Sequence, residues 1–408
     1  MLKEKQRNRE ARKLIRRMDL FLVFLLLCFF LSLQSVIAKP YIPKNDSQVL
    51  EKLTTSLGKP ISKEIKKFKV KLSKNPKDIN LAKGFVENCI EIFRQTSDPR
   101  YLGYAESALK PFLNGKETPP EIFILYATLL QSNHDFKKAL EKLSEALKKD
   151  IYNSQAWLTK ASILQTIGDY ERAKTCCLQL VRFSNNITSI GCASSIGSLS
   201  GQVNKSYKLL DQILNNTPNL TNDEKTWLLT ILSDTTYRLG NITASEKYIK
   251  DALVLKPNDN YLLTFYSDLL LHELKNKEVI SLLKDKTYSD SLLLRLTIAE
   301  KALNLAEYKF HKKELKDRFN ANHLRGDFTH LREEALFELK VSNNSQKALE
   351  LAKKNWIVQK EPIDARILLE SAIASDKKND AKEVIKFLEK TKLEDVYIGN
   401  LVSKEYGK

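Results

Sequence analysis

The sequence is poor in glycine, proline and cysteine, and each shortage narrows the possible fold classes. It has 12 Gly, 11 Pro and 5 Cys in 408 residues. β-rich folds need many turns built from glycine and proline, and their strands alternate apolar and polar residues, a pattern that is scarce here. Strong helix formers, Leu, Ala, Lys and Glu, dominate instead. The composition therefore predicts an all-α protein.

Catalytic and cofactor-binding signatures are also missing. The sequence has no glycine-rich phosphate loop and no Gly-x-Ser-x-Gly elbow, and His272-Glu273 is not followed by a second histidine at helical spacing. His311, His323 and His330 are spaced so that one straight helix would not present all three on one face. The sequence therefore predicts no enzyme activity, no cofactor, no metal site and no small-molecule substrate.

The formal net charge is +17, but basic residues do not gather in one block with aromatic or arginine readers. Lysines are interspersed with Glu and Asp along the helical part of the chain, which is typical of a solvated surface. We therefore expect no nucleic-acid partner.

The N-terminus carries an export pattern. Residues 20–33 form an apolar run that follows a basic segment and precedes the small residues Val36 and Ala38. The run is short for a bilayer span, and the pattern predicts a signal peptide, residues 1–38, cleaved after Ala38. The alternative is an uncleaved inner-membrane anchor formed by residues 20–38. Both place the rest of the chain outside the cytoplasm, so we expect an exported, periplasmic protein.

Apart from Cys28 in the apolar run, the cysteines are Cys89, Cys176, Cys177 and Cys192. Their spacing does not match a metal site. We expect them to be small buried side chains rather than a disulfide.

A repeat organises the chain after the N-terminus. Ala173 follows Ala139 after 34 residues, and segments 120–153 and 154–187 repeat one pattern of aromatic and small residues. We expect the following buried positions and turns: Phe123, Ala127, Phe136 and Ala139 in the first unit, and Trp157, Ala161, Gly168, Tyr170 and Ala173 in the second. Small residues suit close helix crossings. This pattern resembles the tetratricopeptide repeat, which implies a right-handed solenoid of helical hairpins.

Two further units follow these repeats toward the C-terminus, and residues before 119 also read as helical repeats. A degenerate unit covers 187–220, and a clear one covers 226–259, with Gly240 at its turn, Ala252 in its second helix and Pro257 after that helix. We therefore divide the chain into N-terminal repeats (39–118), a repeat core (119–259) and C-terminal repeats (260–408).

The resemblance reaches further than single repeats. Segments such as "DPRYLGYAESALKP", "AWLTKASILQTIGDYERA" and "ALELAKKNWIVQKEPIDARILLESAI" resemble exported bacterial repeat proteins of unknown function. Such proteins are sometimes encoded near membrane proteins of the HupE/UreJ type, which that resemblance suggests as a partner.

A groove is the expected binding surface. In this repeat type the inner face of each first helix lines a concave surface, and here Gln131, Gln165, Asp234, Tyr237 and Arg238 lie on it. That face is polar and mostly neutral, and Tyr237 and Arg238 are the predicted anchors. The alternative is a solvated groove with binding elsewhere. The sequence thus predicts a non-catalytic protein-binding adaptor of the cell envelope; the alternative is an accessory or biogenesis factor acting on envelope proteins or polymers.

Overall fold

The computed structural model describes residues 59–113, 115, 117–327 and 329–407, and this part of the chain contains helices and no strand. The predicted signal or anchor segment, 1–38, lies outside it. Among the described helices, none combines the length and apolar character that a membrane span requires. The α-helices are α2 (Lys59–Lys74), α3 (Ile79–Thr96), α4 (Arg100–Leu109), α5 (Pro120–Ser132), α6 (Phe136–Lys149), α7 (Ser154–Thr166), α8 (Tyr170–Leu180), α9 (Asn186–Ser198), α10 (Val203–Asn216), α11 (Asn222–Arg238), α12 (Ile242–Leu255), α13 (Asn260–His272), α14 (Asn276–Leu283), α15 (Asp290–Ala302), α16 (Glu307–Leu324), α17 (Leu331–Lys340), α18 (Ser345–Val358), α19 (Pro362–Ala374), α20 (Lys382–Thr391) and α21 (Val396–Tyr406). Two 3₁₀ turns, η1 (Lys110–Phe112) and η2 (Lys378–Ala381), complete the set.

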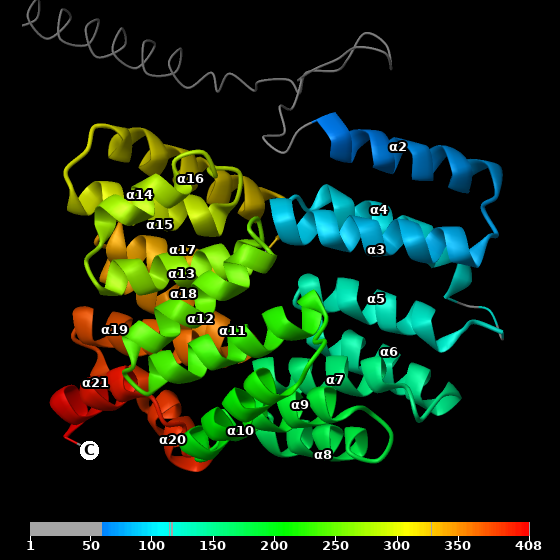
Figure 1. The fold of residues 1–408 in the computed structure, drawn as a ribbon. Coiled ribbons are helices and arrows are strands. Elements are labelled where there is room, and N and C mark those ends of the chain that lie inside the picture. Colours follow the sequence, from blue (N-terminus) through cyan, green and yellow to red (C-terminus); the bar gives the residue numbers. More distant parts are fainter. Residues whose placement is uncertain (1–58, 114, 116, 328, 408) are drawn as a thin grey trace, which may run out of the picture. The chain divides into compact units, whose positions relative to one another are not determined.

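Successive helices pack as antiparallel-type hairpins, α3 with α4, α5 with α6, α7 with α8, α9 with α10, α11 with α12 and α17 with α18, as Figure 1 shows. This is the helical-hairpin repeat architecture that the tetratricopeptide pattern predicts. Four of these six hairpin turns, those before α6, α8, α12 and α18, have a residue with positive φ followed by a capping Asp or Asn. Gly168 has a φ of 79° and the next residue, Asp169, accepts a hydrogen bond from a first-turn amide of α8. Gly240 and Asn241 repeat that arrangement before α12.

The small residues of the pattern lie at helix crossings. Ala127, Ala139, Ala173 and Ala252 are fully buried, and Ala161 is nearly so. Phe123, Phe136 and Tyr170 are buried beside them. Pro257 lies just beyond α12, where a residue without a backbone N–H suits the chain after a helix end.

Trp157 differs from its predicted burial, because it is only partly buried. Its ring packs against two neighbouring core clusters, and its indole Nε1 donates a hydrogen bond to the Ile151 carbonyl at 2.7 Å. An indole N–H needs such a partner, and this one keeps the edge of the ring near the surface.

The prediction of four unpaired thiols is wrong for two of them. Cys177 of α8 and Cys192 of α9 form a disulfide, with 5.5 Å between their Cα atoms. Consecutive hairpins bring the two residues together, although 15 positions separate them in the sequence. Cys89 and Cys176 are free and buried, as predicted.

The C-terminal repeats pack back onto the middle ones. The Lys360 amide donates to the Thr166 carbonyl at 2.7 Å, and the Val203 amide donates to Glu394 at 3.0 Å. In Figure 1, α20 and α21 accordingly lie beside α10 and the end of α11. The chain around the α7–α8 and α9–α10 turns therefore contacts the C-terminal segment rather than open solvent.

The C-terminal segment packs closely against three glycine turns. A Cβ built on Gly168 would lie 2.7 Å from the Phe387 ring. One on Gly201 would lie 3.1 Å from Lys392, and one on Gly240 would lie 3.2 Å from Val396. Each turn already requires a positive φ, so glycine serves both the backbone and the close approach.

Candidate ligand cavity

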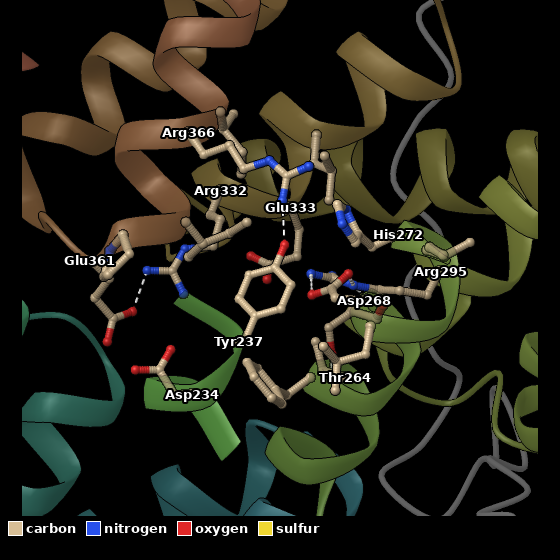
Figure 2. Close-up of a pocket in the computed structure, with 18 of the residues that line it drawn as sticks. Asp234, Tyr237, Thr264, Asp268, His272, Arg295, Arg332, Glu333, Glu361 and Arg366 are labelled. Atoms are coloured by element: carbon tan, nitrogen blue, oxygen red, sulfur yellow. Dashed lines mark hydrogen bonds and ion pairs between the residues drawn. The ribbon is translucent and has the colours of Figure 1, made fainter. Parts of the chain in front are cut away.

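A cavity of about 560 Å³ opens between the middle and C-terminal repeats. Its wall comes mainly from the first helices of successive hairpins, α11, α13, α15, α17 and α19, and Figure 2 shows the side chains that line it. On α13, for example, Tyr261, Thr264, Phe265, Asp268 and His272 follow the spacing of one helical face. Because the hairpins stack regularly, the corresponding faces of several first helices line the same cavity.

The wall contains four arginines, one from each of α11, α15, α17 and α19. On α15, the Arg295 guanidinium donates from Nε and Nη2 to both oxygens of Asp268 on α13, each at 2.9 Å. Arg295 is 2% exposed, so its buried charge is compensated by this bidentate ion pair with Asp268. The pair joins two neighbouring repeats.

Arg332 of α17 binds two carboxylates that precede or begin α19. Its Nε lies 2.6 Å from Asp364 Oδ1, and its Nη2 lies 2.5 Å from Glu361 Oε2. Enclosure by protein raises the pKa of Glu361, against the opposing effect of Arg332; Asp364 and Asp234 raise it further. Figure 2 shows the Asp234 carboxylate facing the same space as Arg332 and Glu361.

Arg366 of α19 connects the two sides of the cavity. It donates to the Tyr237 hydroxyl of α11 at 2.6 Å and to Glu370 at 2.8 Å. Burial raises the pKa of Tyr237 to about 12, so the phenol stays neutral. Burial disfavours the Glu370 carboxylate, but Lys340 and Arg366 outweigh it and lower its pKa.

Aromatic rings surround the Tyr237 side chain. Its ring stacks on Tyr397 of α21, with centroids 4.7 Å apart, and meets Phe265 and His272 of α13 edge to face. Burial lowers the pKa of His272. Arg366 and this aromatic group together fasten the C-terminal helices to α11.

The predicted groove residues have different places. Gln165, Asp234 and Tyr237 line the cavity, whereas Gln131 is not part of its wall and pairs with Ser162 at 3.5 Å. Arg238 requires a correction as a partner anchor, because it is 1% exposed. Its guanidinium donates to the Ser198 carbonyl and to the Glu394 carbonyl, so it holds the closure of the repeats.

The expectation of a mostly neutral binding face also changes. The charged residues come from the C-terminal repeats, which the sequence pattern does not show to fold back. The same spacing that selected the α11 residues would have found Arg295, Arg332 and Arg366 if it had been continued through α15, α17 and α19. Degenerate repeats after residue 260 obscured that register. Among the described residues, no cluster of His, Cys, Asp and Glu could hold a metal ion.

Comparisons with known proteins find distant structural likeness and no sequence family. No family model matches the sequence, and no curated protein matches it either. Among solved structures, a tetratricopeptide repeat protein from Parabacteroides merdae has 14% identity and a TM-score of 0.36, covering 70% of this chain and 98% of that one. Human IFIT1, solved as a dimer with m7Gppp-AAAA, has 14% identity and a TM-score of 0.42, covering 80% of this chain and 85% of that one. These TM-scores are low, and the repeat architecture stands on the helix pairs themselves.

Proposed function

We propose that this protein is a non-catalytic adaptor of the cell envelope that holds a segment of another protein in its internal cavity. The observation that carries the proposal is the cavity, whose wall combines aromatic, apolar and charged side chains from successive hairpins. Solenoids of this type bind partners along such inner faces. An accessory role in the assembly of envelope proteins or polymers would use the same cavity.

The chemistry of the wall favours binding over catalysis. The Arg295 and Arg366 side chains are tied to Asp268 and Glu370, and the Arg332 side chain is tied to Asp364. Such ion pairs neutralise each other and fix the shape of the wall. A general acid or base would instead need a titratable group poised toward a reacting atom.

The disulfide supports export. Disulfides persist in oxidising compartments and are rare in the cytosol, and Cys177 and Cys192 are bonded. A reporter fused after residue 60 should be active only as an extracytoplasmic enzyme, and cytoplasmic activity would contradict export. N-terminal sequencing that starts at Lys39 would establish cleavage, whereas a full-length, membrane-bound product would establish the anchor.

Site-specific photo-crosslinking in intact cells tests the binding role. Tyr261 lines the cavity yet is 60% exposed, so a photoreactive phenylalanine analogue there faces the guest without loss of core packing. Tyr152 is the matched control, since it is 72% exposed and is not part of the cavity wall. We expect a discrete protein product from position 261 and none from 152.

A blocking variant tests whether the crosslinked product from position 261 comes from a partner bound in the cavity. Ala302 is an exposed residue of the wall, so Ala302→Trp adds bulk to the cavity without a buried clash. The position-261 product should disappear in that variant. Equal products from positions 261 and 152, or a product that survives Ala302→Trp, would refute the proposed function.

A further inference from the structure

We propose that the cavity recognises the positive charge of an arginine or lysine side chain on an extended segment of the partner protein. This inference rests on the proposed function and names the chemistry of the bound segment. It starts from a contrast in charge. The whole chain has a net charge of +17, whereas the cavity wall is slightly acidic. Its cations are Arg238, Arg295, Arg332, Lys340 and Arg366, and its anions are Asp234, Asp268, Glu333, Glu361, Glu370 and Asp395.

The cations of the wall are already occupied. Arg295 is held by both oxygens of Asp268, and Arg332 is held by Asp364 and Glu361. Lys340 lies 2.6 Å from Glu370, which Arg366 also binds. An anionic guest would have to displace these carboxylates and would meet their repulsion. The wall therefore disfavours phosphate or nucleic acid.

Hydrogen-bond acceptors, in contrast, remain open. Glu333 of α17 lines the cavity and has no hydrogen bond within the described part of the chain. Asp234 uses one oxygen for Arg238 and leaves the other without a partner there. Asp395 uses one oxygen for the first amides of α21. An ionised carboxylate accepts hydrogen bonds and donates none, so these groups suit a guest that donates.

A buried amide of the wall repeats this preference. Asn260 is 7% exposed, and its Nδ2 donates to Ser97 Oγ at 2.7 Å. Its Oδ1 is buried and has no hydrogen-bond partner in the structure. Buried polar atoms are normally paired, and the unpaired atom of this side chain is an acceptor, like the open oxygens of the carboxylates.

Aromatic rings complete the match. Tyr261 and Phe265 lie in the cavity wall, and guanidinium and ammonium groups bind favourably over aromatic rings. Apolar residues such as Ile298 and Leu336 lie in the same wall and suit the methylene stem that carries the charge. Tyr261 and Leu274, near opposite ends of α13, are both exposed members of the wall, so the cavity is open to solvent and accessible to a chain.

Calorimetric titration of the exported chain tests this inference with defined probes. The probes are an acetylated hexapeptide with two central arginines, its counterparts with two glutamines or two glutamates, spermidine, and a short single-stranded RNA. We expect the arginine peptide to bind at least tenfold more tightly than its glutamine counterpart, because a charge-assisted hydrogen bond contributes that much or more. The glutamate peptide and the RNA should not bind.

The key variant is Glu333→Gln, which removes a carboxylate that makes no hydrogen bond in the described structure. Arg295 and Arg332, which feel its charge, keep their ion pairs with Asp268 and Asp364, so the fold should persist. It should weaken binding of the arginine peptide about tenfold. Glu350→Gln is the matched control, because Glu350 is an exposed residue that pairs with Lys354 and lies outside the cavity wall. That variant should bind like the wild type.

The possible results separate the alternatives. Binding of spermidine without the arginine peptide would overturn the assignment to a peptide side chain, and binding of RNA or of the glutamate peptide would overturn the preference for a cation. Equal binding by wild type and Glu333→Gln would exclude this carboxylate as the recognition group and refute the inference. If no probe binds but Tyr261 still crosslinks specifically, the inference fails and the proposed function stands. If that crosslink is also absent, both fail.

Discussion

Closure of the repeats by the C-terminal segment can be measured at one glycine turn. Gly168 and Gly326 both have positive φ, 79° and 69°, so alanine at either position carries a similar backbone penalty of about 1–2 kcal/mol. They differ in what surrounds them. A Cβ on Gly168 would lie 2.7 Å from the Phe387 ring and 3.1 Å from Lys360 Cβ, whereas one on Gly326 would have no neighbour within 4 Å among the described residues.

The Phe387 ring has little freedom to move away. It meets Tyr170 and Trp356 edge to face, with centroids 5.8 and 5.2 Å from its own. Gly168→Ala therefore forces α20 away from the turn and adds an overpacking cost of about 1–3 kcal/mol to the backbone penalty. Gly326→Ala carries the backbone penalty alone.

Denaturant unfolding and hydrogen exchange of both variants provide the comparison. We expect Gly168→Ala to be the less stable variant by about 1–3 kcal/mol, with faster exchange in α20 and α21. Gly326→Ala should leave exchange in those two helices unchanged. If the two variants lose equal stability and α20 exchanges alike in both, the C-terminal segment does not pack on this turn, and the cavity wall that depends on it is wrong.

Three further predictions concern the repeat register, the disulfide and the acidic wall. Ala173→Leu should overpack the crossing of α7 and α8 and cost about 1–3 kcal/mol in denaturant unfolding; a neutral effect would mean that fully buried Ala173 is not at a tight crossing. Cys177→Ala combined with Cys192→Ala should lower the free energy of unfolding by about 3 kcal/mol, because the 15-residue loop is no longer closed in the unfolded chain. Reduced wild-type protein should be as unstable as this double variant. If the double variant is instead as stable as the oxidised wild type, the disulfide is not present. Because the pKa of Glu361 is raised above its ordinary 4.5, its charge is lost at a higher pH than that of an exposed glutamate, so affinity for the arginine peptide should fall as the pH drops toward that range; calorimetry that shows tighter binding in acid would contradict the acidic-wall assignment.

The helical repeat and its register could be predicted from sequence, because both depend on local patterns. Ala139 and Ala173 recur at the helix crossings, and Gly168 and Gly240 mark turns that need positive φ, so neighbouring residues along the chain determine these features. The absence of catalytic motifs likewise pointed to binding. Export and the signal segment remain predictions.

Long-range packing decided the rest. Arg238 has the residue type and spacing of an exposed inner-face anchor, but it is 1% exposed and donates to the carbonyls of Ser198 and of Glu394, 40 and 156 positions away. The cysteine spacing favoured free thiols, and only the approach of α8 and α9 made a bond possible between Cys177 and Cys192. The cavity exists because hairpins distant in sequence face each other across it, and such a contact leaves no periodic trace in the chain. Its slightly acidic character follows from which charged residues the fold brings to that space, and this depends on three-dimensional position rather than on composition.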